Sequence, residues 1–116
     1  MIEMSFKNDL IIAPSMLAAD PLNLEYEIKK IENSGAEFLH IDIMDGHFVL
    51  NLSFSPDTVK ALRKKSKLFF DVHLMISEPE KYIKAFCEAG ADLVTIHSEI
   101  TDNPVELAEL IHSFGV

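Results

Sequence analysis

The chain has 116 residues, 48% of them hydrophobic and 25% charged, and 19 acidic against 10 basic side chains give a net charge of −9. This predicts one folded domain and excludes a general electrostatic surface for nucleic acid or an anionic membrane. Apolar runs break well before 18 residues and Cys87 is the single cysteine, so we expect no membrane span, no internal disulfide and a cytoplasmic protein.

Short runs rich in Ile, Val, Leu and Phe predict four strands. They are largely apolar on both faces, as strands are when helices cover a parallel sheet. In chain order they cover residues 10–15, 37–44, 68–75 and 93–97.

A pattern with helical periodicity follows each predicted strand, and a proline marks each helix start. Proline suits the first turn of a helix because its missing N–H would have no partner there. Ser77 and Glu80 also have the spacing of a capping box. The prolines are Pro21, Pro56, Pro79 and Pro104, and three of the helices are expected to end at Gly35, Gly90 and Gly115.

The regular alternation of strand and helix indicates parallel strands joined by right-handed crossovers. Residues 34–42 also resemble residues 89–97, an offset of 55 residues over two units, although any helix-glycine-strand junction looks similar. Units of roughly 27 residues are typical of a (β/α)8 barrel of about 250 residues. We therefore predict an α/β fold, a TIM (β/α)8 barrel, with residues 1–116 as the N-terminal half of a single domain and about its first four βα units.

Polar residues interrupt the second and third predicted strands. Alternate residues of a strand share a face, so each strand presents a histidine, an aspartate and a methionine on one side. These lie near the C-terminal ends, where ligands bind in barrels and open α/β sheets. They are His40, Asp42 and Met44 in one strand and Asp71, His73 and Met75 in the next.

A single histidine in a strand is more often a hydrogen-bonded core residue than a ligand. His40, Asp42 and His73 together instead predict a site for a divalent metal ion, because two imidazoles and a carboxylate on adjacent strands form a set of N and O ligands. Such a set does not distinguish Zn, Mn, Fe or Co. Asp71 either joins this site or only accepts a hydrogen bond from a neighbour.

Other residues near the strand ends have two readings each. Met44 and Met75 are core residues or an apolar cover over a substrate, and Ser15 is a turn hydroxyl or a substrate hydrogen-bond donor. His97 could belong to the same ring of residues, with no role assigned. Asp45-Gly46 is expected to be a turn.

Three segments, residues 12–20, 39–49 and 71–75, closely resemble the ribulose-phosphate 3-epimerase family. The string L-H-x-D-x-M-D-G-x-F within the second is long and specific, and the resemblance extends from Leu10 onward. Leu50 and Ser55 depart from the proline and glycine common there, which affects loop conformation more than chemistry.

The resemblance implies an isomerase of the pentose phosphate pathway that interconverts D-ribulose 5-phosphate and D-xylulose 5-phosphate with one divalent metal ion. It implies His40, Asp42 and His73 as metal ligands, Asp42 as a catalytic acid/base, and Ser15, His73, Met44 and Met75 around the substrate. The second catalytic aspartate and the phosphate loops belong to the other half of the barrel. We expect this fragment alone to be inactive and the full-length form to be a homo-oligomer.

Three alternatives remain at this point. A phosphoketohexose 3-epimerase, of the allulose 6-phosphate type, would use the same motifs. A non-catalytic half-barrel could be an assembly module, because unpaired strand edges favour association. A decarboxylase or synthase would need a lysine near the acidic residues of the strands, whereas the nearby Lys67 precedes its strand.

Overall fold

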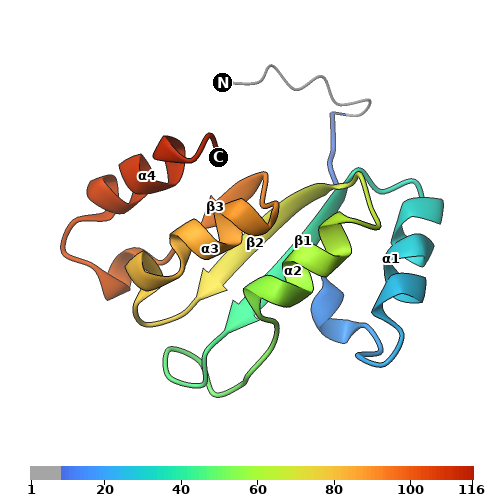
Figure 1. Ribbon diagram of the computed structural model, residues 1–116, viewed down its shortest axis with the longest axis horizontal. Coiled ribbons are helices and arrows are strands. Elements are labelled where there is room, and N and C mark those ends of the chain that lie inside the picture. The colour runs from blue at the N-terminus through green and yellow to red at the C-terminus, as the bar shows by residue number, and fades with distance from the viewer. Residues whose placement is uncertain (1–8) are drawn as a thin grey trace.

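The computed structural model describes residues 9–116, in which three parallel strands form one sheet in the order β1-β2-β3 (Figure 1). The strands are β1 (Phe38–Met44), β2 (Phe69–Met75) and β3 (Leu93–Thr95). The register pairs Phe38 with Phe69 and Met44 with Met75 in the first ladder. The second ladder is shorter and runs from Asp71–Leu93 to His73–Thr95.

Four α-helices alternate with the strands: α1 (Leu24–Asn33), α2 (Pro56–Arg63), α3 (Ile83–Ala89) and α4 (Pro104–Ser113). Short 3-10 helices cover Met16–Ala18 (η1), Pro79–Lys81 (η2) and Ser98–Ile100 (η3). Helices α2 and α3 lie side by side over one face of the sheet (Figure 1). None of the helices in residues 9–116 is long and apolar enough to cross a membrane.

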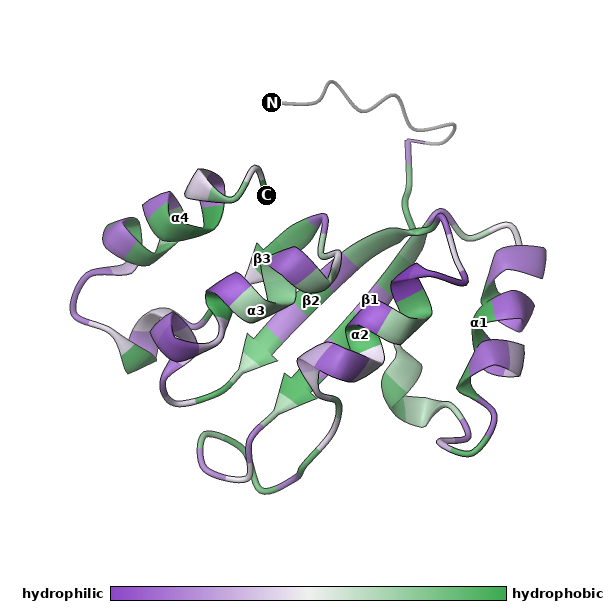
Figure 2. Ribbon diagram, viewed as in Figure 1, coloured by the Kyte–Doolittle hydropathy of each residue, from purple (hydrophilic) through white to green (hydrophobic). Residues whose placement is uncertain are grey.

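The core lies between this face of the sheet and the helices. Burial alternates along β2, where each apolar residue facing the helices is buried and each residue between them is partly exposed. Figure 2 shows the same alternation as purple positions within the green strands. The buried apolar strand residues are Leu39, Ile41 and Ile43 of β1 and Phe70, Val72 and Leu74 of β2. The histidines and aspartates of the strands therefore project from the opposite face.

The α/β fold, with parallel strands alternating with helices as in part of a (β/α)8 barrel, is confirmed, but residues 10–15 do not form the predicted strand. They make one isolated bridge, between Ser15 and His40, in which the His40 N–H donates to the Pro14 carbonyl (2.9 Å). Pro14 has no N–H to extend the pairing, and Leu10 and Ile12 are 77% and 67% exposed. Strand β3 is also shorter than predicted, because η3 follows at Ser98.

Two of the predicted helix starts are confirmed. Pro56 and Pro104 begin α2 and α4, and the side chains of Ser55 and Asn103 accept the backbone N–H groups of Thr58 and Glu106. These caps satisfy donors that the first helical turn leaves free.

The other two helix starts are wrong. Asp20 accepts the Leu22 N–H and holds Pro21 in a turn, so α1 begins only at Leu24. Pro79 begins η2 rather than α3, and the capping box does not form because the Ser77 N–H donates to Asp45. The helix-ending glycines are confirmed by their positive φ angles, at Gly35, Gly90 and Gly115.

Candidate metal centre

Strands β1 and β2 bring His40, Asp42 and His73 together, as predicted. Asp42 lies opposite His73 in the parallel register, and His40 is two residues before Asp42 on the same face. One ring nitrogen of each histidine and one carboxylate oxygen all lie within 4.8 Å of one another. Asp42 Oδ1 is 3.0 Å from His40 Nε2 and 3.2 Å from His73 Nδ1.

Asp71 fixes the orientation of the His40 ring. His40 Nδ1 lies 2.8 Å from Asp71 Oδ2. An ionised carboxylate only accepts, so Nδ1 carries the hydrogen, and in the neutral imidazole Nε2 then presents a lone pair toward Asp42. Of the two readings of Asp71, acceptance of a hydrogen bond from a neighbour is the one that the geometry supports.

Ser15 orients Asp42 from the other side. Its hydroxyl donates to Asp42 Oδ2 (2.5 Å) and accepts the Leu17 N–H (3.1 Å) at the start of η1. Ser15 thus makes the contacts of a turn hydroxyl, with its hydrogen directed at the carboxylate, and its predicted contact with a substrate stays a prediction.

Asp42 is only 9% exposed, yet its environment favours the charged form. Burial raises its pKa, but the Ser15 hydroxyl and, when no cation is present, a proton held between the carboxylate and the imidazoles of His40 and His73 lower the pKa below the ordinary value of 3.8. The carboxylate is therefore ionised at neutral pH and available as a ligand or a base.

His73 contacts a second histidine, which the sequence indicated without a role. His73 Nε2 lies 2.7 Å from His97 Nε2, and His97 Nδ1 lies 3.3 Å from Glu99 Oε1. The ring of Phe48 lies against His97, with 4.8 Å between centroids. Sequence reasoning missed Glu99 and Phe48, although a histidine two residues before an acid at a strand end is a usable signal.

The three residues fit a divalent cation. With Nδ1 of His40 protonated, Asp42 Oδ1 and His40 Nε2 direct lone pairs at one another across 3.0 Å, and His73 Nδ1 faces the same oxygen. Such an arrangement is repulsive unless a proton or a cation lies among the three atoms. Imidazole nitrogen and carboxylate oxygen suit Zn, Mn, Fe and Co.

Met44 and Met75 end the two strands as a register pair, are both partly exposed, and lie on the same face as His40 and His73. Their predicted contact with a substrate stays a prediction. Lys67, by contrast, lines a hollow at the opposite edge of the sheet.

Asp45 and Gly46 form the predicted turn, with Gly46 at φ +75°. Asp45 Oδ1 accepts the N–H groups of His47 and Phe48, both at 2.9 Å, and Oδ2 accepts the Ser77 N–H at 2.8 Å. Asp45 thereby joins the loop after β1 to the loop after β2. This connection, which the sequence did not indicate, holds the two strand ends that carry the site.

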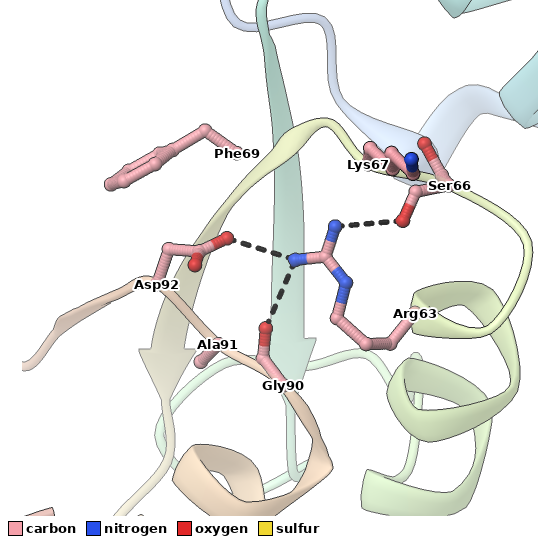
Figure 3. A pocket seen from close by; sticks show the side chains of 7 residues that line it. All are labelled: Arg63, Ser66, Lys67, Phe69, Gly90, Ala91 and Asp92. Carbon is pink, nitrogen blue, oxygen red and sulfur yellow. Dashed lines mark hydrogen bonds and ion pairs between the residues drawn. The ribbon is translucent and has the colours of Figure 1, made fainter. Parts of the chain in front are cut away.

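A hollow of about 560 Å³ lies at the opposite, N-terminal edge of the sheet. Figure 3 shows Arg63 at its centre, directed toward Asp92, Gly90 and Ser66. Its guanidinium donates to three carbonyl oxygens and one carboxylate of the chain itself. The hollow is thus separate from the candidate metal centre.

The ribulose-phosphate 3 epimerase family model matches residues 11–116. Curated relatives carry the name ribulose-phosphate 3-epimerase. The protein of Eremothecium gossypii is 51% identical over 91% of this chain and 49% of its own length. The Rhodobacter capsulatus protein is 51% identical over 97% and 50%, and the Bacillus subtilis protein 48% identical over 90% and 48%. The chain spans about half the length of these relatives.

Proposed function

The chain belongs to the ribulose-phosphate 3 epimerase family, and on that premise we propose that it contributes the metal centre and one of two proton-transferring groups to the 3-epimerisation of D-ribulose 5-phosphate to D-xylulose 5-phosphate. The observation that carries the proposal is the convergence of Asp42 Oδ1, His40 Nε2 and His73 Nδ1. The relatives' shared name supplies the reaction and the sugar.

Three of the chain's residues would hold the ion. His40, Asp42 and His73 are the proposed ligands, and a bound divalent ion supplies stabilisation of the negative charge that develops on the sugar oxygens. Asp71 accepts the Nδ1 hydrogen of His40, which leaves Nε2 of the neutral imidazole for the ion. A carboxylate that orients a metal-binding histidine in this way is the usual arrangement in metal sites.

Asp42 is the proposed general base. The proton at the carbon next to the ketone is weakly acidic, and an ionised carboxylate held beside it can remove it. We place the proton on Asp42 Oδ2, the oxygen that faces Ser15 rather than the imidazoles. The Ser15 hydroxyl has a second lone pair besides the one that accepts the Leu17 N–H, so it can turn to accept that proton's hydrogen bond.

Inversion at carbon requires a second acid on the opposite side of the substrate. Among residues 9–116, the carboxylates of the two main strands, Asp42 and Asp71, lie on one face of the sheet, and Asp71 is held by His40. We propose that residues 1–116 correspond to the N-terminal half of a (β/α)8 barrel. The second carboxylate and the phosphate contacts would then come from the other half, with Met44 and Met75 as apolar cover over the sugar.

Solvent isotope exchange at C3 tests the base without requiring full epimerisation. The intact protein is incubated with ribulose 5-phosphate in D₂O, with and without added Mn²⁺, and deuterium incorporation is followed by NMR. We expect metal-dependent exchange that Asp42→Asn lowers by about 1000-fold, while His112→Gln, an exposed control, leaves it unchanged. Near wild-type exchange in Asp42→Asn would show that another group is the base. Parallel assays with allulose 6-phosphate separate the pentose from the hexose substrate.

One observation favours a second candidate function, assembly of half-barrels without catalysis. Leu10 and Ile12, next to the single bridge to β1, are 77% and 67% exposed and leave an apolar segment for a partner. Light scattering coupled to size-exclusion chromatography tests this idea, since a strictly monomeric 13.1 kDa species would exclude it.

A further inference from the structure

We infer that His97 and Glu99 are positioning residues that set which nitrogen of His73 is available to a metal ion. The inference rests on the proposed function, because it concerns the orientation of one proposed ligand. Its basis is a continuous chain of contacts from Glu99 through His97 to His73.

The direction of each hydrogen bond follows from the carboxylate at its end. Glu99 Oε1 accepts, so His97 Nδ1, 3.3 Å away, carries the hydrogen. In a neutral imidazole the other nitrogen then has a lone pair, which makes His97 Nε2 an acceptor. His73 Nε2, at 2.7 Å, must therefore donate. His73 Nδ1 is left without hydrogen, and it is this atom that faces Asp42 Oδ1.

The ring geometry supports a hydrogen bond between the two histidines. Their planes differ by only 21°, and their nitrogens, 2.7 Å apart, are much closer than their centroids, 4.9 Å apart. The rings thus meet through their nitrogen edges. A separation of 2.7 Å is also too short for a metal ion between the two nitrogens, since each Zn–N bond is about 2.0–2.1 Å.

Phe48 and burial keep the His97 ring in this position. The Phe48 ring contacts it at 4.8 Å, and the His97 side chain is 28% exposed, whereas Glu99 is 62% exposed. We therefore expect His97 to contribute more than Glu99. The arrangement matches that on the other side of the site, where Asp71 directs His40 through its Nδ1 hydrogen.

Titration of the intact, metal-free protein with Co²⁺ tests the inference, with affinity read from the visible absorption of the bound ion. We expect His97→Ala to weaken Co²⁺ binding by roughly 10- to 100-fold, the range for residues that orient metal ligands. His97→Gln, whose amide oxygen can accept from His73 Nε2, should recover part of the loss, and Glu99→Gln should weaken binding less. The matched control is His112→Ala, an exposed histidine on α4. The shape of the absorption band should not change in His97→Ala, because His97 is not a ligand.

Several results would overturn the inference. Wild-type affinity in both His97→Ala and Glu99→Gln would do so, and so would a His97→Ala band altered as in His40→Ala, which would make His97 a ligand. Ring ¹⁵N NMR of the metal-free protein gives a readout independent of metal. We expect hydrogen on Nδ1 of His97 and Nε2 of His73, and the reverse pattern would refute the proposed chain of hydrogen bonds from Glu99 through His97 to His73. Failure of the unaltered protein to bind Co²⁺ would refute the proposed metal centre. The NMR pattern would still show whether His97 and Glu99 set the hydrogen position on His73.

Discussion

The two edges of the sheet both gather charged side chains, yet they differ in where the hydrogen bonds go. At the N-terminal edge, Arg63 donates to the carbonyls of Gly90 (3.2 Å), Ser66 (2.8 Å) and Leu68 (2.7 Å) and to Asp92 (2.9 Å). At the C-terminal edge, His40 and His73 each direct a ring nitrogen at Asp42 Oδ1, at 3.0 Å and 3.2 Å. Two imidazole nitrogens and a carboxylate oxygen that converge form a set of metal ligands, whereas the Arg63 guanidinium is already bonded to oxygens of the chain itself.

The N-terminal edge has a structural role that follows from the contacts of Arg63. Arg63 ends α2 and joins it to the start of β2 and to the turn between α3 and β3, and its guanidinium lies 3.8 Å above the centroid of the Phe70 ring. Asp92 accepts the Phe70 N–H as well as Arg63. These bonds hold the bases of β2 and β3 in register.

His40→Ala should give the largest effect and should act on metal binding alone. The variant removes one ligand, so Co²⁺ affinity should fall by more than the roughly 100-fold upper range for orienting residues. The unfolding free energy should change by less than about 1 kcal/mol, because the His40 side chain is 25% exposed and water can replace it beside Asp71. Co²⁺ titration and urea unfolding measure the two quantities. A large loss of unfolding free energy in His40→Ala with unchanged Co²⁺ affinity would show that the C-terminal edge has a structural role, as the N-terminal edge does.

Arg63→Met should show the opposite behaviour. Methionine keeps an apolar stem over Phe70 but removes the Arg63 donor from three carbonyls and leaves Asp92 with the Phe70 N–H alone. We expect a loss of about 3 kcal/mol in unfolding free energy, given roughly 1–3 kcal/mol for a buried group left unsatisfied. Urea unfolding measures this loss, and the Co²⁺ affinity of the folded variant should equal that of the wild type. Weakened Co²⁺ binding would mean that the two edges are coupled through β2.

Gly90→Ala tests the packing around Arg63 from the side of the turn after α3, with Gly35→Ala as the matched control. Both glycines follow a helix with positive φ, +119° and +85°. A Cβ on Gly90 would lie 2.4 Å from Arg63 Cδ, whereas a Cβ on Gly35 meets nothing within 4 Å. We expect about 1 kcal/mol lost in Gly35→Ala from backbone strain and about 2 kcal/mol in Gly90→Ala.

Thermal or urea unfolding of the double variant Arg63→Met/Gly90→Ala sharpens this test. If displacement of the arginine causes the excess cost at Gly90, the double variant should lose less unfolding free energy than the sum of the two single-variant losses, because the effects of residues in contact are not additive. Equal losses in the two glycine variants would contradict the crowding around Arg63.

The convergence of His40, Asp42 and His73 was predictable because it depends on local rules. The period of two in a strand put His40 and Asp42 on one face, and the parallel alternation placed His73 on the adjacent strand. The sequence left the role of Asp71 open between two alternatives and did not indicate that Ser15 donates to Asp42, since both contacts depend on side-chain distances across elements.

The hydrogen bonds of Arg63 and the predicted strand at residues 10–15, which does not form, show where sequence reasoning failed. Most of Arg63's partners are backbone carbonyls, which carry no signal in the sequence, and an arginine at a helix end is usually solvated. Residues 10–12 have the composition of a strand, but a strand also needs a partner with matching donors and acceptors, and the segment makes only one bridge. Composition predicted the extended segment without indicating its pairing.

Asp45→Asn should give the smallest effect, visible only in acid. It tests how much the charge of Asp45 stabilises the loops after β1 and β2, beside the candidate metal centre. Burial raises the pKa of Asp45, but the N–H groups of Ser77, His47 and Phe48 outweigh it and lower the pKa from 3.8 to about 2. A lowered pKa stabilises the folded state above pH 3.8, and that contribution is lost as the pH falls toward 2. Urea unfolding between pH 4 and pH 2 should therefore show a steeper loss of stability in the wild type than in Asp45→Asn. Parallel curves would mean that the charge of Asp45 does not hold the loops after β1 and β2 together, and that the metal edge depends on strand pairing alone.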